Sequence, residues 1–436
     1  MITFDQILPK LIEVFTACQA DLTQLGEMII NRDLNGRVRL IANDTIEGNP
    51  SALAALTTLC EQMVQALGNH AFTVNQLVIF ESDVRAIRHQ APSFLLADFT
   101  SIYVIDRLAT EGSWATISEE STTAPRIVFF SIKGGVGRST ALAVTAWSLA
   151  EQGKKVLVLD LDLESPGLSS NLLPEERRPT FGITDWLVED LVDNSDMIFK
   201  DMVVTSELSR NGDIYVVPAH GRDIGEYIAK LGRVWMPKIG ACGKRESWSE
   251  RLERLIGQLE SKYLPDVILI DSRAGIDEIA SACVTDLKAN LVLLFALAGA
   301  QTWTGYSILF SYWHRLGVIQ KIRERLQIVA AMIPDDERRI AYIEDLRDQS
   351  QITFINDVYD ELTQESDTDA FNFDELDESA PHYPLEIRWN TGFSALTSLS
   401  RRLESLDENT VKLVFGNLID NVSIIVNAAQ QRKDTL

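Results

Sequence analysis

Residues 131–140 read Ser-Ile-Lys-Gly-Gly-Val-Gly-Arg-Ser-Thr, a glycine-rich run with a lysine near its start and an arginine near its end. The run follows the apolar segment Arg126–Ile132 and precedes a helical pattern. A strand, a glycine loop and a helix N-terminus, in this order, form the cradle that proteins use to bind phosphate groups. The three glycines, Gly134, Gly135 and Gly137, let the backbone approach the phosphates and turn its N–H groups toward them. The stretch therefore predicts a phosphate-binding loop.

Two further segments place carboxylates at the ends of apolar runs. Lys155–Leu161 opens into Asp160-Leu-Asp162, and an apolar run that ends at Ile270 leads into Asp271. Aspartates commonly follow buried strands as helix caps. Here the two carboxylates lie two residues apart and about 20 residues after a glycine loop. This spacing favours a ligand-binding site at the edge of a parallel sheet over a pair of helix caps.

The three segments together resemble the ParA/MinD family of P-loop ATPases, whose deviant Walker A motif reads Lys-Gly-Gly-x-Gly-Lys-Ser/Thr. The resemblance implies that ATP is the nucleotide and that Mg²⁺ is the metal ion. The implied nucleotide-binding residues are Lys133, Gly134, Gly135, Val136, Gly137, Arg138, Ser139 and Thr140. The implied Mg²⁺ site consists of Ser139, Asp160 and Asp271, partly through water.

Catalysis in this family would rest on Lys133, Arg138 and Asp162. Lys133 matches the lysine that reaches across a dimer to the partner's ATP, and Asp162 matches the residue that positions the attacking water. Arg138 replaces the usual Walker A lysine, and this change is not conservative, because a planar guanidinium fork replaces a compact ammonium. Two interpretations stay open: a slow ATPase, or a degenerate protein that binds nucleotide without hydrolysing it.

The resemblance also names candidate switch residues. Pro166 and Gly167 belong to the first switch, and Gly275 is the mobile turn of the second. Arg273 stands where many relatives carry proline, and it either contacts phosphate or a partner or is a solvated surface residue. In this family, loops that follow the last strands of the sheet bind adenine, and here these loops are the regions 332–334 and 382–387.

Composition limits the class of protein. The chain is 46% hydrophobic and 24% charged, as in an ordinary soluble protein, and we expect no membrane-spanning run and no secretory signal. The four cysteines are scattered and form no Cys-x-x-Cys pair, which indicates reduced thiols, a cytoplasmic location and no iron–sulfur cluster. These cysteines are Cys18, Cys60, Cys242 and Cys283.

The net charge of −23 does not favour nucleic acid as a partner, because that binding relies on Lys and Arg neutralising phosphates. Ten acids and no Lys or Arg lie within an insertion at 357–380. The insertion is either a solvated segment or a docking site for a basic protein, and the interleaved Phe371 and Phe373 favour docking somewhat.

We expect two domains: an N-terminal α/β or α+β domain over 1–120 and a ParA/MinD-like ATPase domain over 125–436. The latter should be an α/β fold with a doubly wound, mostly parallel sheet, because apolar runs alternate with helical patterns. Helical patterns include Phe4–Ile30, Val411–Ala428 and 396–403, and Ile352–Ile355 reads as a short strand.

The leading functional hypothesis is an ATP-driven homodimerisation switch that controls a protein partner through the N-terminal domain or the acidic insertion. The arginine variant of the loop resembles a bacterial subgroup in accessory and defence-type operons. The alternatives are a plasmid partition ATPase on DNA, a membrane switch, and a nucleotide-sensing module that does not hydrolyse ATP. The single lysine in Val411–Ala428 argues against the membrane switch.

Overall fold

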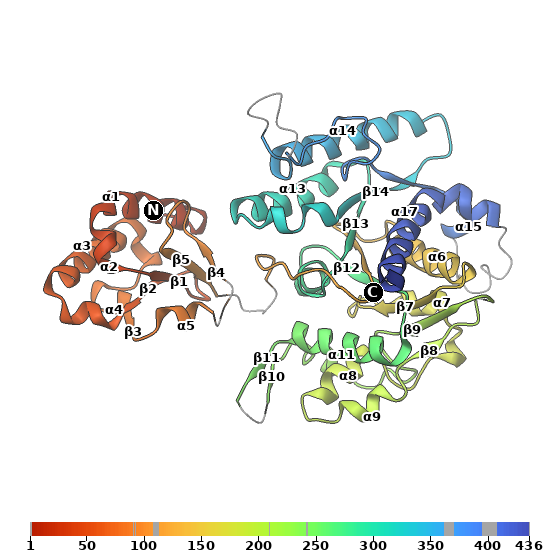
Figure 1. The fold of residues 1–436 in the computed structure, drawn as a ribbon, viewed down its shortest axis with the longest axis horizontal. Coiled ribbons are helices and arrows are strands. Elements are labelled where there is room, and N and C mark those ends of the chain that lie inside the picture. Colours follow the sequence, from red (N-terminus) through yellow and green to blue (C-terminus); the bar gives the residue numbers. More distant parts are fainter. Residues whose placement is uncertain are drawn as a thin grey trace. The chain divides into compact units, whose positions relative to one another are not determined.

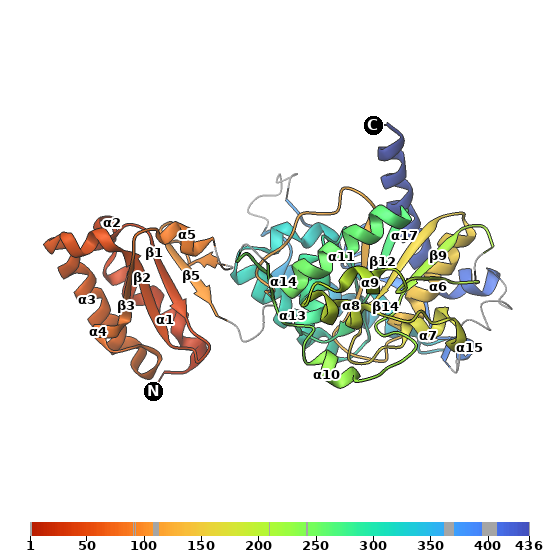
Figure 2. The ribbon, with the colours of Figure 1, turned by 90° about the horizontal axis from the view of Figure 1, so that it is seen from below.

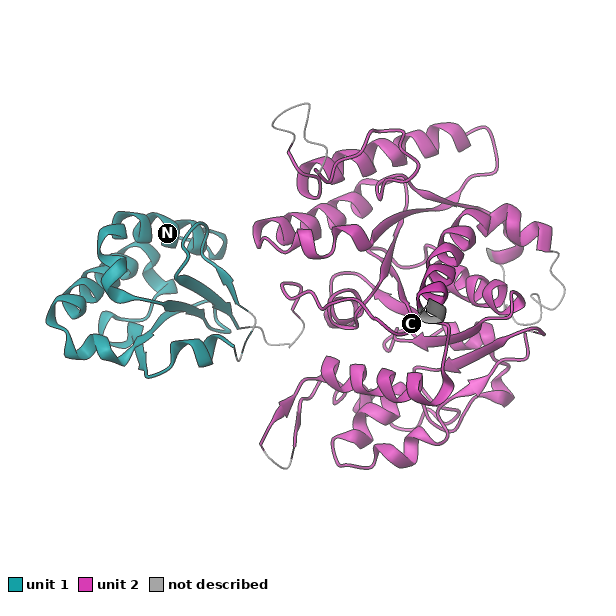
Figure 3. Ribbon diagram, viewed as in Figure 1, with its two compact units in different colours: residues 1–110 teal, residues 111–436 magenta. Residues whose placement is uncertain are grey.

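The chain divides into two compact units, Met1–Thr110 and Glu111–Leu436 (Figure 3). The computed structural model describes residues 2–89, 91, 93–107, 113–208, 210–240, 243–361, 370–394 and 408–435. Residues 113–124 run along the second unit, where Ser118 N–H donates to the carbonyl of Thr285 and Ser121 N–H to that of Lys288. The second unit thus begins before residue 120, where the sequence prediction ends the N-terminal domain.

The first unit is a five-stranded mixed sheet with helices on both faces, of order β3-β2-β1-β5-β4. Its strands are β1 (Met28–Arg32), β2 (Val38–Asn43), β3 (Val78–Glu81), β4 (Ser93–Leu95) and β5 (Ile102–Asp106). Its helices are α1 (Ile7–Ala17), α2 (Gln19–Leu25), α3 (Pro50–Leu67), α4 (Val74–Leu77) and α5 (Val84–Arg88). α1 and α3 bury their apolar stripes on one face, and Val84 of α5 packs on the other.

The helical prediction over Phe4–Ile30 is wrong at its end. Gly26 ends α2 with φ at +70°, and β1 follows as the central strand. Ile29 and Ile30 are β-branched and fully buried, one on each face of the sheet. Burial on both faces suits a strand and leaves no helical periodicity to detect.

The second unit is built on an eight-stranded sheet of order β15-β14-β13-β6-β12-β7-β9-β8. All neighbouring strands pair in parallel except β8, which is antiparallel at one edge. The strands are β6 (Arg126–Ser131), β7 (Lys155–Asp160), β8 (Val204–Thr205), β9 (Asp213–Val217), β12 (Val267–Ala274), β13 (Leu291–Ala296), β14 (Leu326–Ile333) and β15 (Leu385–Arg388). A separate hairpin pairs β10 (Lys238–Ile239) with β11 (Arg245–Glu246).

Helices cover both faces of this sheet (Figure 1). They are α6 (Arg138–Glu151), α7 (Leu168–Leu172), α8 (Ile183–Asp190), α9 (Ser195–Phe199), α10 (Tyr227–Leu231), α11 (Trp248–Tyr263), α12 (Glu278–Ser281), α13 (Ala300–Arg315), α14 (Arg339–Asp357), α15 (Thr391–Ser394) and α17 (Glu408–Thr435). Alternate residues of β6 point to opposite faces: Phe129 packs in the core with α6 and α17, and Phe130 in the core with α11 and α13. The prediction of a doubly wound, mostly parallel α/β fold is confirmed.

The C-terminal helix α17 is long and apolar enough to cross a membrane, by length and composition alone. This corrects the expectation that no run of such length exists. In the structure α17 packs along α6 and β15, and one of its faces is buried in the core. The buried side chains are Val411, Val414, Phe415, Leu418, Ile419, Val422 and Val426. A core helix of a soluble protein shows the same pattern.

The strand predicted at Ile352–Ile355 is wrong, because these residues lie inside α14 and both isoleucines are exposed. The helix expected at 396–403 lies outside the described residues. Within the acidic insertion, Phe371 and Phe373 pack on Tyr359, with ring centroids 5.8 and 5.7 Å away. Both aromatic residues therefore belong to the fold and do not support docking of a partner.

Candidate functional site

The glycine loop joins β6 to α6 at the carboxyl edge of the parallel sheet. Gly137 is the N-cap of α6 with φ at +82°, in the left-handed region that residues with a Cβ rarely adopt. The first backbone N–H groups of a helix have no intrahelical acceptor, so the start of α6 suits an anion. Lys133 is exposed, and in the described part of the chain its ammonium has no hydrogen bond or ion pair.

A cavity of about 850 Å³ opens beside the loop, within the range of about 300–1,000 Å³ that is typical of ligand pockets. One part of its wall is polar: Gly134, Gly135, Val136, Gly137, Arg138, Ser139, Thr140, Asp162, Ser165 and Arg273. The other part is mostly apolar and aromatic: Met332, Ile387, Arg388, Trp389, Asn390, Phe393 and Phe415. A phosphate chain suits the first part, and a flat base suits the second.

Arg138 is almost fully buried, and its guanidinium holds three groups at once. Its Nε donates to Asp271 Oδ1 at 2.7 Å, its Nη1 to Ser131 Oγ at 3.1 Å, and its Nη2 to Asp162 Oδ2 at 3.3 Å. Burial lowers the pKa of Arg138, but the charge and hydrogen bond of Asp271 more than offset this effect. Arg138 thus links the two carboxylate segments that the sequence singles out, a geometry that a single ammonium cannot reproduce.

Ser139 and Asp160 also belong to the cluster of polar side chains beside the glycine loop. The Ser139 hydroxyl donates to Asp271 Oδ2 at 2.6 Å. Asp160 Oδ2 accepts from the N–H and the hydroxyl of Ser169, while Asp160 Oδ1 is buried without a hydrogen-bond partner. Burial, together with the charge of Asp271, raises the pKa of Asp160 to about 7. Burial also raises the pKa of Asp162, against the opposing charge of Arg138.

This oxygen set fits a magnesium ion. Mg²⁺ prefers hard oxygen ligands and keeps several waters, so it needs few direct protein ligands beside the phosphates. The unpaired Asp160 oxygen and the Ser139–Asp271 pair supply a hydroxyl and carboxylates of this kind. Among the described residues no group of three or more His, Cys, Asp or Glu side chains could hold a metal ion by itself.

The structure also shows what holds the candidate switch residues. Arg273 lines the cavity and pairs with Glu164 at 2.6 Å and Asp277 at 2.9 Å, so it bridges the segments that follow β7 and β12. Gly275 has φ at +101°, and its N–H donates to the carbonyl of Ser131 at the end of β6. Pro166 is half-buried and Gly167 exposed just before α7, and neither lines the cavity.

The apolar part of the cavity lies at the carboxyl ends of β14 and β15, where α15 and α17 also line it. Of the regions expected to hold the base, Met332 and Ile387 line the cavity. His382 does not, because it is buried and its ring bonds to the Tyr359 hydroxyl. Sequence reasoning missed Trp389, whose backbone N–H donates to the carbonyl of Ile333 at 2.7 Å. Only the pairing of β15 with β14 brings this tryptophan to the cavity, and the short β15 has no clear sequence signal.

The three described cysteines, Cys18, Cys60 and Cys283, are free and buried. Cys242 lies outside the described residues. Burial raises the pKa of both the Cys60 and the Cys283 thiols, so these thiols stay protonated and unreactive.

Comparison with known proteins gives a family match and several similar proteins. A family model described as an AAA domain matches residues 124–328. Septum site-determining protein MinD of Escherichia coli (strain K12) is 34% identical over 93 residues, which are 21% of this chain and 31% of that protein. The chain therefore matches about a third of the length of this curated relative.

Two solved structures of similar proteins align with about 70% of the chain. The septum site-determining protein MinD of Pyrococcus horikoshii OT3, complexed with Mg-ADP, is 19% identical, with 70% of this chain and 99% of that chain covered and a TM-score of 0.41. The MinD cell division protein of Aquifex aeolicus is 16% identical, with 69% and 97% covered and a TM-score of 0.42.

Proposed function

The second unit of this chain belongs to the ParA/MinD-like family of P-loop ATPases, and we propose that it binds ATP with Mg²⁺, hydrolyses it slowly, and alternates between monomer and homodimer. One observation carries the proposal. A single cavity joins the glycine loop, Asp162 and Arg273 to an apolar wall that contains Trp389. No other ligand class uses this combination of a helix N-terminus, cationic side chains and an aromatic platform as fully as a nucleoside triphosphate does.

Different residues would have different roles in the transfer of the phosphoryl group to water. Ser139, Asp160 and Asp271 would hold Mg²⁺, which would offset the negative charge of the phosphates. Asp162 lines the cavity and would orient the attacking water, and Arg138 keeps Asp162 in place through their 3.3 Å contact. Water adds to the γ-phosphorus, the bond to the β-phosphate oxygen breaks, and ADP and phosphate leave, without a covalent intermediate.

Dimerisation is proposed through Lys133. Its ammonium is exposed at the carboxyl edge and has no partner within the described part of its own chain. An unpaired cation beside a phosphate site can neutralise charge on a second subunit's nucleotide at the moment the two copies meet. Hydrolysis and phosphate loss would remove that attraction and release the dimer.

We also propose that a protein partner reads the nucleotide state, through the first unit or through the acidic insertion at 357–380. The first unit has its own core and two helix-covered sheet faces, as expected of a module with a separate task.

Phosphate release tests the proposed hydrolysis. The wild-type chain with Mg²⁺ and ATP should release phosphate, Asp162→Ala should bind nucleotide but release none, and the exposed Asp196→Ala on α9 should match the wild type. If Asp162→Ala turns over like the wild type, Asp162 has no part in the reaction. If the wild type binds ATP and never releases phosphate, the protein is a nucleotide sensor and not an ATPase.

A further inference from the structure

A basic, partly apolar segment stands between β9 and α11. Residues 222–246, here called the basic arm, contain six basic and three acidic residues, so this segment carries +3 and leaves −26 for the rest of a chain of charge −23. Four large apolar side chains of the arm are exposed: Ile224 (53%), Ile228 (87%), Met236 (52%) and Ile239 (63%). Exposed apolar residues among charged side chains are typical of protein interaction surfaces.

The arm is connected to the nucleotide site. The Tyr227 hydroxyl of α10 donates to the carbonyl of Leu163 at 2.6 Å, and Leu163 directly follows Asp162. Figure 2 shows α7, α10 and α15, which follow β7, β9 and β15, on the same side of the second unit. The arm therefore lies at the carboxyl edge of the sheet, the edge that also carries Lys133.

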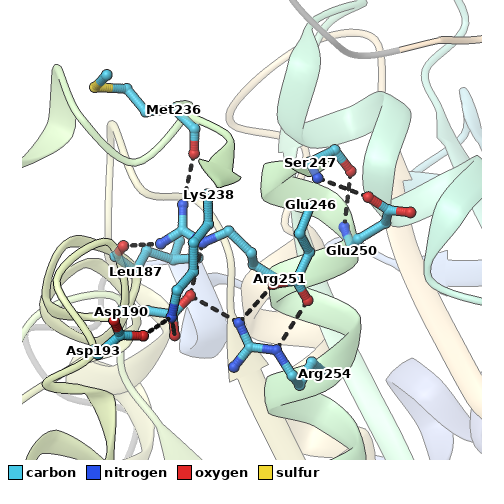
Figure 4. A network of polar contacts seen from close by, with 10 residues as sticks. All are labelled: Leu187, Asp190, Asp193, Met236, Lys238, Glu246, Ser247, Glu250, Arg251 and Arg254. Atoms are coloured by element: carbon cyan, nitrogen blue, oxygen red, sulfur yellow. Dashed lines mark hydrogen bonds and ion pairs between the residues drawn. The ribbon is translucent and has the colours of Figure 1, made fainter. Parts of the chain in front are cut away.

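The base of the arm is firmly anchored (Figure 4). Asp190 of α8 accepts from Arg251 at 2.8 Å, from Arg254 at 2.8 Å and from Lys238 at 3.2 Å. Arg254 also donates to Glu246 of β11, at 2.9 and 3.0 Å. Both strands of the hairpin are thereby held to α8 and α11, so its exposed side chains form a preorganised surface, which lowers the entropy cost of binding.

A surface of opposite charge lies on the other flank of the same edge. Residues 335–348, here called the acidic flank, contain six acids and three bases, a net charge of −3. The three arginines already have partners in Asp336, Glu386 and Tyr383. Asp335 and Glu337 are exposed, and the described structure shows no ion pair for either of them. Ile340, 70% exposed, lies between these acids and the rest of α14.

Strand order gives the spacing of the two flanks. The glycine loop follows β6, the acidic flank follows β14 two strands away, and the basic arm follows β9 three strands away on the opposite side. At about 4.8 Å per strand, these distances are about 10 and 14 Å. Consider two copies whose glycine loops face each other, related by a two-fold axis that passes between these loops. If the axis is perpendicular to the sheet, it exchanges the two sides of the sheet, and each basic arm meets the partner's acidic flank. If the axis lies within the sheet plane, each arm meets the partner's arm.

We propose that, in the ATP-dependent homodimer, the basic arm of each copy docks on the acidic flank of the other, with Ile228 and Ile340 buried in the contact. The proposal rests on the proposed function, because it names the surface that completes that dimer. It also links assembly to the nucleotide site: movement of the Asp162 loop shifts Tyr227, and with it the arm.

Paired charge reversal tests this docking. The arm variant carries Arg233→Glu with Lys244→Glu, and the flank variant carries Asp335→Lys with Glu337→Lys; all four side chains are exposed. With a non-hydrolysable ATP analogue and Mg²⁺, light scattering should show at least a tenfold weaker dimer for each variant alone. An equimolar mixture of the two should dimerise again, because both contacts of the mixed dimer join opposite charges. The control is Arg315→Glu, at the C-terminal end of α13, combined with Lys321→Glu, which follows that helix.

The outcomes separate the two proposals. If the wild type dimerises and each variant alone dimerises equally well, or if the mixture of variants fails to dimerise, the arm does not meet the flank. Calorimetry with the analogue must show normal nucleotide binding by every variant, which establishes that each one is folded. A wild-type chain that stays monomeric refutes the ATP-dependent dimer itself and this docking with it.

Discussion

Removing the charge of Arg138 should destabilise the nucleotide-free protein strongly. The guanidinium is the described ion-pair partner of Asp271, whose side chain is 1% exposed, and it also holds Asp162 at 15% exposure. Breaking a buried pair from one side leaves an uncompensated charge, which costs about 3–5 kcal/mol. We therefore expect Arg138→Met to lower the free energy of unfolding by about this amount.

Arg138→Lys should lie between the wild type and Arg138→Met. Lysine keeps the positive charge, but its ammonium cannot span both carboxylates as the guanidinium does. At least one charge-assisted hydrogen bond is lost, worth about 1.5–3 kcal/mol. The expected order of stability is therefore wild type, then Arg138→Lys, then Arg138→Met.

Tryptophan fluorescence during urea unfolding is a suitable assay, because all eight tryptophans lie between residues 114 and 389, in the second unit. The signal thus follows the unit that contains Arg138 and is not complicated by the first unit. The control is Arg338→Met, which breaks an exposed ion pair with Asp336 and should change nothing measurable. If Arg138→Met unfolds at the wild-type urea concentration, the guanidinium does not hold the two carboxylates as the geometry indicates.

Three further predictions concern single residues. Gly137→Val should abolish binding of an ATP analogue in calorimetry, because φ at +82° excludes a β-branched residue, whereas Gly257→Ala in the interior of α11, where a Cβ meets open space, should bind normally. The pKa of Asp160 is raised to about 7, so the folded chain keeps a proton that the unfolded chain releases near pH 3.8. The free energy of unfolding should therefore fall by about 4 kcal/mol as pH rises from about 4 to 7. In urea unfolding, Asp160→Asn should remove this pH dependence. Burial alone would raise the pKa of Asp190, but hydrogen bonds from the cations in Figure 4 lower it to about 2. The lowered pKa stabilises the folded chain by about 2 kcal/mol above pH 4, and this stabilisation should disappear as pH falls to 2. Asp190→Asn should not show this loss in urea unfolding.

Some elements could be predicted from the sequence because their signals are local. The strand β13 is a continuous apolar run and β14 is one apart from Gln327, as expected for parallel strands buried on both faces. The helix α11 begins with a serine capping box. The glycine loop and the aspartates were recognisable because phosphate and metal chemistry require particular residues at short spacing. In the structure the glycine loop and Asp162 line one cavity at the carboxyl edge of the sheet.

Other features depend on contacts between distant segments. β1 looked helical because its neighbours in sequence are helical, and only pairing with β2 and β5 makes it a central strand. Trp389 reaches the cavity only through the pairing of β15 with β14. The partners of Arg138 lie 7, 24 and 133 residues away, so its role as a link between carboxylates could not be derived from the loop alone.

Mass measurement by light scattering tests the ATP-dependent dimer most directly. Asp162→Ala, which should bind ATP without turnover, is measured with Mg²⁺ and either ATP or ADP, beside the same variant that also carries Lys133→Ala. We predict twice the 48.7 kDa monomer mass with ATP, the monomer mass with ADP, and a monomer in both nucleotides when Lys133 is absent. A strict monomer of Asp162→Ala with saturating ATP would contradict the account, as would a dimer that forms equally well without Lys133.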